Sequence, residues 1–413
     1  MVGMTTYDLF VTAARGTEPW AEREAFEAGA CKTSIVPGGV QVRGGLEVAY
    51  RLCLWSRVGQ RVLLPLSAFR VTSPDALYQA VYSVPWQEHL CPDTPFEVEC
   101  TASAKSPITH THFAALKTKD AIADYFRHRC GRRPSVAREG PRVTVHLYLG
   151  AHTGTISIDL SGEPLYKRGY RREAAVAPLK ETLAAALLYA ADWPQRAAEG
   201  EPLVDPFCGS GTIVIEAALM ALDRAPGLTR RHFGFLAWKG HDAALWQALL
   251  AEAYKRARAS APRPIRIHGS DVSHEALALA RRAARWAGVN PALNLVRGDA
   301  RAVEPPTGPG VVVTNPPYGK RVSSAGLDEL YASLGDLLRR RFLGWTAYVF
   351  TGNLDAARRI GLRADRRMIL WNGPIEARLL RFPIAATPVR GTGPSWRRRS
   401  RPRGATEKSR CNE

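Results

Sequence analysis

The residues whose types and spacing best suit chemistry follow a short apolar run, Val311–Thr314. Three valines in a row predict a strand buried on both faces, as in a parallel sheet. Asn315, Pro316, Pro317 and Tyr318 come next, and the prolines end the strand because neither can donate a backbone hydrogen bond. Two oxygens, the amide of Asn315 and the carbonyl of Pro316, could accept the N–H groups of an exocyclic amine while the ring of Tyr318 stacks on its heterocycle. We therefore predict a catalytic turn, formed by Asn315, Pro316, Pro317 and Tyr318, that acts on an amino group, with a turn that only ends the strand as the alternative.

A second polar turn follows the predicted strand Leu203–Asp205 and leads into a predicted helix. Its glycines allow the backbone to approach a ligand closely, and the helix N-terminus offers free N–H groups. The spacing matches neither the dinucleotide fingerprint nor a phosphate-binding P-loop. Asp205 would instead face an amine-bearing ligand, which suits the methionine part of S-adenosylmethionine. The predicted cofactor residues of this turn are Asp205, Pro206, Phe207, Cys208, Gly209, Ser210, Gly211 and Thr212.

Two more aspartates follow predicted strands of the same sheet. Asp271 could accept hydrogen bonds from both ribose hydroxyls of a nucleoside, or could cap the helix that begins near Ser273. Asp299, with Ala300 beside it, could accept from the N6 amine of adenine, or could be an ordinary turn residue. Independent turns would rarely place such side chains at the carboxyl ends of successive strands. We therefore predict one cofactor site that also includes Asn315.

Strands and helices alternate beyond residue 200, which predicts an α/β fold with a mostly parallel, doubly wound, Rossmann-like sheet. The turn at Asn372-Gly373-Pro374 predicts a closing antiparallel hairpin. Residues 7–160 mix alternating strands with helices over Thr17–Ala28 and Phe113–Tyr125, which predicts an α+β region. The predicted elements of the parallel sheet are strands Leu203–Asp205, Ile265–Gly269, Leu295–Val296, Val311–Thr314 and Ala347–Phe350, and helices from Gly211, over Ser273–Ala287 and over Leu327–Phe342.

The chain is strongly basic, with 57 Lys and Arg against 38 Asp and Glu and a formal net charge of +19. Such a balance favours a polyanionic partner, although basic faces that are simply solvated are the alternative. Seven scattered cysteines without C-x-x-C spacing, no long apolar run and no secretory leader indicate a cytoplasmic protein with no metal site and no membrane span. The candidates for RNA contact are Lys117, Lys119, Lys167, Arg168, Arg171, Arg230 and Arg231.

These motifs, together with YDLFVTAARGTEP, LKTKDAIADYF, DLSGEPLYKRGYR and NGPIEARLL, resemble the bacterial THUMP-domain RNA methyltransferases. The closest resemblance is to the RlmL-type enzymes that methylate guanine N2 of 23S ribosomal RNA. It implies a ferredoxin-like segment (1–45), a THUMP RNA-binding domain (46–160), a linker with a leading helix (161–195) and a methyltransferase domain (196–387). Some relatives carry a second methyltransferase domain, whereas here a basic tail (388–413), which we expect to be disordered, follows.

The sequence thus favours methyl transfer from S-adenosylmethionine to N2 of a guanine in 23S ribosomal RNA, with a monomer as the default state. A THUMP-type guanine-N2 methyltransferase of transfer RNA would share every chemical motif. A DNA amino methyltransferase uses a similar Asn-Pro-Pro-aromatic turn, but residues 1–160 resemble an RNA-binding module. A non-catalytic RNA-binding assembly factor with a relic fold is the alternative from another class of protein.

Overall fold

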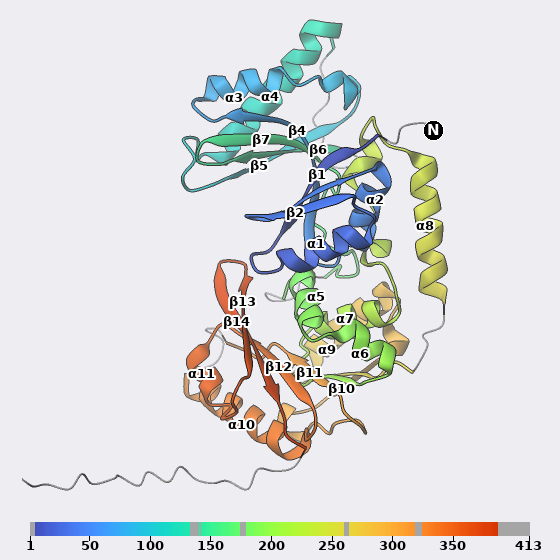
Figure 1. Cartoon of the computed structure of the whole chain (residues 1–413), viewed down its shortest axis with the longest axis vertical. Coiled ribbons are helices and arrows are strands. Elements are labelled where there is room, and N and C mark those ends of the chain that lie inside the picture. The colour runs from blue at the N-terminus through green and yellow to red at the C-terminus, as the bar shows by residue number, and fades with distance from the viewer. Residues whose placement is uncertain are drawn as a thin grey trace, which may run out of the picture.

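The computed structural model describes residues 5–132, 140, 142–173, 179–259, 264–318 and 324–386, and only the backbone of residues 324 and 325. Two seven-stranded sheets lie one above the other in the long molecule (Figure 1). Residues up to Asp159 form the first sheet, and residues from Leu203 form the second. The predicted order, an α+β region followed by a mostly parallel α/β unit, is therefore confirmed.

The sheet of the N-terminal unit has the order β2-β3-β1-β4-β7-β6-β5. All its described strand pairs are antiparallel except β5 with β6. The long strand β4 pairs with β1 on one side and with β7 on the other, so the sheet runs without a break through the predicted division at residue 45. The strands are β1 (Tyr7–Ala13), β2 (Lys32–Val36), β3 (Gly39–Gly44), β4 (Gly59–Arg70), β5 (Phe96–Ala102), β6 (Val143–Leu149) and β7 (Thr153–Asp159).

Helices of the N-terminal unit fall into two pairs, seen at different ends of the sheet in Figure 1. Helix α1 (Glu18–Glu27) and helix α2 (Leu46–Trp55) lie toward the second unit. Helix α3 (Pro74–Tyr82) packs against α4 (Thr111–Cys130) at the far end. The two helices predicted here are both present, and α4 extends beyond its predicted bounds to a left-handed cap at Gly131, where φ is 66°. A short 3-10 helix, η1, covers Trp86–Glu88.

The second sheet has the order β10-β9-β8-β11-β12-β14-β13. Strands β10, β9, β8, β11 and β12 are parallel. Strand β14 pairs antiparallel with β12 and with β13, so the hairpin β13–β14 closes the sheet as predicted. The valines of β11 are fully buried and alternate between the cores on its two faces. The strands are β8 (Leu203–Asp205), β9 (Ile267–Asp271), β10 (Leu293–Arg297), β11 (Val311–Thr314), β12 (Thr346–Thr351), β13 (Arg366–Asn372) and β14 (Ile375–Pro383).

One strand differs from its prediction in a way that matters for the site. Strand β9 runs over Ile267–Asp271, two residues later than predicted, so Asp271 is its last residue rather than a loop residue beyond it. The prediction followed the apolar residues at the start of the segment. The observed strand is set by backbone pairing, because β9 pairs with β8 as far as Gly269 and with β10 as far as Asp271.

Helices cover both faces of the second sheet. The face opposite α10 and α11 carries the Ala- and Leu-rich α5 and the apolar α7, which contact each other. The helices are α5 (Glu181–Ala190), α6 (Trp193–Glu199), α7 (Thr212–Ala221), α8 (Ala243–Arg258), α9 (His274–Ala287), α10 (Ser324–Arg341) and α11 (Leu354–Arg358). Short 3-10 helices are η2 (Pro226–Thr229), η3 (Gly234–Ala237), η4 (Asn290–Ala292) and η5 (Ala300–Ala302).

One of the two hydrophobic cores extends through both units. The segment around η3 leaves the second unit and packs on the first, where Phe235 lies 4.4 Å from Tyr50 between ring centroids. Phe233, Phe235 and Trp238 are buried, so this aromatic segment is a packed element rather than an open RNA surface. Within the described residues, no helix is both long and apolar enough to cross a membrane.

Candidate active site

Four predicted polar residues lie at one edge of the second sheet. Asp205 ends β8, Asp271 ends β9, Asn315 follows β11 directly, and Asp299 lies two residues beyond β10. These four strands are parallel neighbours in the order β10-β9-β8-β11, so their carboxyl ends share an edge. Open α/β sheets bind ligands outside this edge.

Asp205 is held at the centre of this edge by two donors. Its Oδ1 accepts from the hydroxyl of Thr314 at 2.6 Å and from the backbone N–H of Phe207 at 3.1 Å. Burial raises the pKa of Asp205 to about 7, and the bonds from Thr314 and Phe207 offset part of that rise. The role of Thr314 was missed by sequence reasoning, although a hydroxyl at the end of a valine strand was a visible indication.

Asp271 joins two turns. Its Oδ2 accepts from the N–H of Gly209 at 2.9 Å, and its Oδ1 accepts from the N–H of Ser273 at 2.9 Å. The helix α9 is capped instead by Ser273, whose hydroxyl accepts from the N–H of Ala276 at 3.1 Å. Capping is therefore not the function of Asp271, which orients the glycine turn.

The glycine turn packs tightly against its neighbours on one side and is open on the other. Gly211 caps α7 with φ at +83°, and a Cβ there would lie 2.9 Å from the Cβ of Ala280. A Cβ built on Gly209 would meet nothing within 4 Å. Pro206 and Cys208 are buried beneath the turn, Phe207 packs against the core, and Ser210 is partly exposed. The open side is where a ligand can approach the backbone.

Asp299 has a different environment from the other acids. Its side chain is 41% exposed, and both carboxylate oxygens accept from Arg301, the shortest distance being 2.6 Å. The bond from Arg301 lowers the pKa of this carboxyl. Asp299 also caps η5, whose first residue is the buried Ala300. A ligand amine would therefore share Asp299 with Arg301.

The proline turn offers an acceptor without a donor. The Oδ1 of Asn315 is buried and accepts no hydrogen bond from the described residues. Pro316 is buried and Pro317 is exposed. Leaving a buried polar atom unpaired costs free energy, so a ligand N–H that donated to this oxygen would be stabilised. Asn315 therefore presents a free acceptor at the sheet edge.

Tyr318 is packed sideways against the end of the sheet. Its hydroxyl accepts from the Nδ2 of Asn372 at 2.9 Å, and its ring stands edge-on to Phe350 with centroids 6.3 Å apart. The ring also covers Gly352, where a Cβ would meet it at 3.0 Å. Sequence reasoning missed Asn372, because nothing local connects it to a residue 54 positions earlier.

Three of the arginines predicted to contact RNA make structural contacts, and the prediction is wrong for the buried Arg168. Arg168 is 2% exposed, donates to the carbonyls of Ser56, Arg57 and Leu165, and lies 3.5 Å from the carboxylate of Glu216. The guanidinium of Arg168 therefore joins the two units, and its buried position keeps it away from an RNA phosphate.

Arg171 and Arg230 are held in the same way. Arg171 donates to the hydroxyl of Thr212 at 2.5 Å and pairs with Glu181, so it ties the linker to the start of α7. The guanidinium of Arg230 donates to four backbone carbonyls between Ser161 and Lys167, and burial lowers its pKa to about 10. Charge in the sequence could not reveal this, because a basic residue that binds carbonyls looks the same as one that faces water.

The other basic candidates keep partly or fully exposed side chains. Lys117 pairs with Asp75 at 3.5 Å, Lys167 pairs with Glu163 at 2.9 Å, and Lys119 and Arg231 lie at the surface. Contact of these four residues with RNA remains a prediction.

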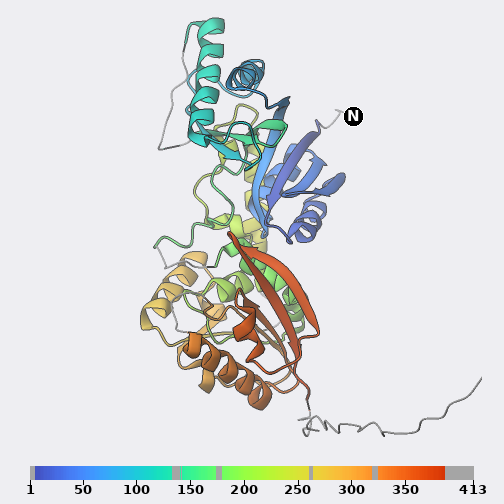
Figure 2. The ribbon, with the colours of Figure 1, turned by 90° about the vertical axis from the view of Figure 1, so that its left-hand side faces the viewer.

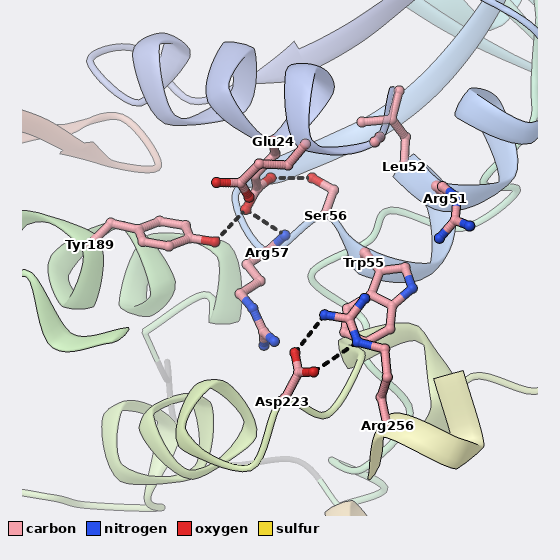
Figure 3. Close-up of a pocket in the computed structure, with 11 residues that line it drawn as sticks. Glu24, Arg51, Leu52, Trp55, Ser56, Arg57, Tyr189, Asp223 and Arg256 are labelled. Atoms are coloured by element: carbon pink, nitrogen blue, oxygen red, sulfur yellow. Dashed lines mark hydrogen bonds and ion pairs between the residues drawn. The ribbon is translucent and has the colours of Figure 1, made fainter. Parts of the chain in front are cut away.

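A cavity of about 310 Å³ lies at the junction of the units, away from the strand ends (Figure 3). Two of its arginines are already paired, Arg51 with Glu252 and Arg256 with Asp223. Glu24 accepts from Ser56, from two backbone N–H groups and from the hydroxyl of Tyr189 in the second unit, and burial raises its pKa. We interpret this polar junction as the element that fixes the orientation of the units.

Comparison with protein families gives a match for nearly every described part. The RMKL-like methyltransferase domain matches residues 168–381, the THUMP domain matches 71–159, and the RlmL ferredoxin-like domain matches 8–63. The aligned regions therefore cover the strand-end site and most of the first sheet.

Individual relatives agree with these families. The chain is 47% identical over 381 residues to the ribosomal RNA large subunit methyltransferase K/L of Methylococcus capsulatus, covering 92% of this chain and 52% of that protein. The chain thus spans about half the length of this curated relative. A crystal structure of a candidate methyltransferase complexed with SAH superposes with a TM-score of 0.82 at 30% identity, covering 92% of this chain and 98% of that one.

A further crystal structure, described as a predicted N6-adenine-specific DNA methylase from Listeria monocytogenes, superposes with a TM-score of 0.80 at 30% identity and covers 92% of this chain and 97% of that one. The catalytic family model matches more than half of the 413 residues, and the two solved relatives are covered almost completely. The chain therefore belongs to the RMKL-like methyltransferase family, with THUMP and RlmL ferredoxin-like domains ahead of its catalytic domain.

Proposed function

We propose that this protein transfers a methyl group from S-adenosylmethionine to the exocyclic N2 of a guanine in 23S ribosomal RNA. The observation that carries the proposal is the unpaired, buried Oδ1 of Asn315 at the carboxyl edge of the second sheet. Together with the carbonyl of Pro316 it provides two acceptors for the two hydrogens of an amine. The name of the Methylococcus relative supports ribosomal RNA as the substrate.

The residues at the edge fit S-adenosylmethionine, whose sulfonium supplies the methyl group. The open side of Gly209 and the start of α7 allow close approach of the methionine part, beside the buried carboxyl of Asp205. Asp271 already accepts from two N–H groups, and its remaining lone pairs suit the ribose hydroxyls. Asp299 suits the N6 amine of adenine. The SAH complex of a 30% identical relative supports the same class of cofactor.

The protein would act mainly by orientation. A guanine amine is a weak nucleophile because its lone pair is delocalised into the ring. Asn315 and Pro316 would hold both hydrogens, so that the nitrogen lone pair points toward the cofactor, and closure around the base would remove water. No side-chain base is required at the start, since the proton can leave after the nitrogen has become cationic. Tyr318 would stack on the base once it has left its helix.

The N-terminal unit would bind the RNA. We propose the division into 1–45, 46–160, 161–195 and 196–387, with RNA contacts from Lys117 and Lys119 in the N-terminal unit and from Lys167 and Arg231 beyond it. The basic tail, 388–413, lies outside the described residues, and we propose that it adds charge for RNA binding. Ribosomal RNA as the substrate also favours the cytoplasm as the location.

Two other substrates use the same chemistry. Transfer RNA presents the same guanine amine. DNA is favoured by one observation, the description of the Listeria relative as an N6-adenine-specific methylase. The THUMP match of the first unit favours RNA. A non-catalytic assembly factor would bind RNA but leave the Asn315 acceptor without a purpose.

Methylation of purified nucleic acids tests the proposal. The protein is incubated with isotopically labelled S-adenosylmethionine and with unmodified 23S ribosomal RNA, transfer RNA or DNA, and the nucleosides are separated by mass spectrometry. We expect labelled N2-methylguanosine from 23S ribosomal RNA alone. Label in transfer RNA or in N6-methyladenine of DNA would replace the proposed substrate, and no label in any of them would favour the assembly factor.

A further inference from the structure

Tyr318 owes its position to the hairpin β13–β14. The amide of Asn372 donates to its hydroxyl at 2.9 Å, Phe350 meets the ring at an interplanar angle of 89°, and Gly352 lies under the ring. Phe350 and Gly352 are apolar contacts along which a ring can slide. The bond from Asn372 is directional and fixes where the hydroxyl end of the ring lies.

Asn372 is itself rigidly placed. It is the last residue of β13 and pairs with Ile375 across the two-residue turn Gly373-Pro374, where φ of Gly373 is +61°. Short hairpin turns of this kind fix the register of both strands. The amide therefore approaches Tyr318 from a defined backbone position.

The other side of the hairpin rests on the N-terminal unit. A Cβ built on Gly16 in the turn between β1 and α1 would lie 2.7 Å from the carbonyl oxygen of Ile369, so this contact leaves room only for glycine. The guanidinium of Arg15 lies 5.2 Å from the ring centre of Trp371, the neighbour of Asn372. Figures 1 and 2 both show the hairpin reaching up to the helix α1.

We propose that Asn372 is a positioning residue for the target base: it holds Tyr318 where the ring can stack on that base. The contact of Gly16 and Arg15 with β13 then fixes the position of the hairpin relative to the N-terminal unit. The RNA-binding unit therefore fixes the geometry of the base pocket as well as binding the substrate. This inference rests on the proposed function, because it requires a base that stacks on Tyr318.

A double-mutant cycle separates positioning from general stability. Asn372→Leu removes the donor at similar volume, Asn372→Asp can accept a bond from the Tyr318 hydroxyl instead, and Tyr318→Phe removes the hydroxyl while keeping the ring. Ile369→Ala, an exposed side chain on the same strand, is the matched control. Single-turnover methylation, SAH affinity and RNA affinity are measured for each protein, with melting temperature as the fold check.

We expect Asn372→Leu to lower the single-turnover rate by roughly three- to tenfold, with SAH and RNA affinities within twofold of wild type. Asn372→Asp should recover most of the rate, and Asn372→Leu should cost nothing further in the Tyr318→Phe background. The inference would be overturned if Asn372→Leu lowered the single-turnover rate equally in the wild-type and Tyr318→Phe backgrounds. It would also be overturned if the wild type were active and Asn372→Leu did not lower its rate. A wild type that methylates no RNA would instead refute the proposed function.

Discussion

The buried carboxyl of Asp205 makes stability depend on pH in a calculable way. Asp205→Asn removes the ionisable group and keeps an Oδ1 that can accept from Thr314 and from the N–H of Phe207. The pKa of Asp205 rises from its ordinary 3.8 to about 7 in the folded protein. The folded state therefore binds more protons than the unfolded state within this window, and its stability falls as pH rises through it.

The size of the effect follows from the shift. At about 1.4 kcal/mol for each pKa unit, the wild type loses at most about 4 kcal/mol relative to Asp205→Asn over the whole window. Between pH 5 and pH 8 the expected loss is about 3 kcal/mol, and the difference should be nearly constant above pH 8. Burial is the largest cause of the shift, so an open, hydrated site would give a smaller change.

Urea denaturation of both proteins at a series of pH values measures this difference. The contributions of the other titrating groups to the free energy of unfolding cancel, because both proteins contain them. Asp355→Asn, which changes a carboxylate whose side chain is 88% exposed, is the matched control and should stay within about 0.5 kcal/mol of wild type. A difference between wild type and Asp205→Asn that does not vary between pH 5 and pH 8 would refute the reasoning.

Three other changes test separate parts of the account. Asp271→Ala should weaken SAH binding by roughly 1.5–3 kcal/mol in calorimetry, since it removes a charge-assisted hydrogen bond together with the orientation of the glycine turn; an unchanged Kd would contradict its role. Arg168→Met should lower the free energy of unfolding by about 3–5 kcal/mol, because Glu216 would keep a buried charge without its cation. A stable Arg168→Met protein with weakened RNA binding would restore the RNA-contact interpretation. Deleting the tail from residue 390 should reduce the slope of log K against log salt by about 0.7 for every RNA phosphate that the tail neutralises, and an unchanged slope would mean that the tail does not touch RNA.

Local patterns predicted the sheet and the edge of the site well. The valine run of β11 can only be buried on both faces, and the prolines after it leave the chain no way to continue the strand. The turn after β8 is equally constrained, because Gly211 has φ of +83°, a conformation that favours glycine. Each of these features depends on neighbouring residues alone, so one sequence is enough to find them.

Features that depend on distant contacts could not be predicted. The end of β9 is set by pairing with β10, although its own residues become polar. Arg168 looks like a solvated cation in the sequence, yet its partners lie more than 100 residues earlier and in α7. The bond from Asn372 to Tyr318 depends on the way the closing hairpin folds back over the strand ends.

The central claim is that the free acceptor of Asn315 orients the amine that is methylated, and Asn315→Ala tests it most directly. Single-turnover methylation of 23S ribosomal RNA is measured beside SAH binding for wild type and variant. We predict a rate lower by about 10²–10³-fold, as for other preorganised polar groups at a reacting centre, with an SAH Kd within a few-fold of wild type. A near-normal rate would contradict the claim, and so would a loss explained entirely by weaker SAH binding.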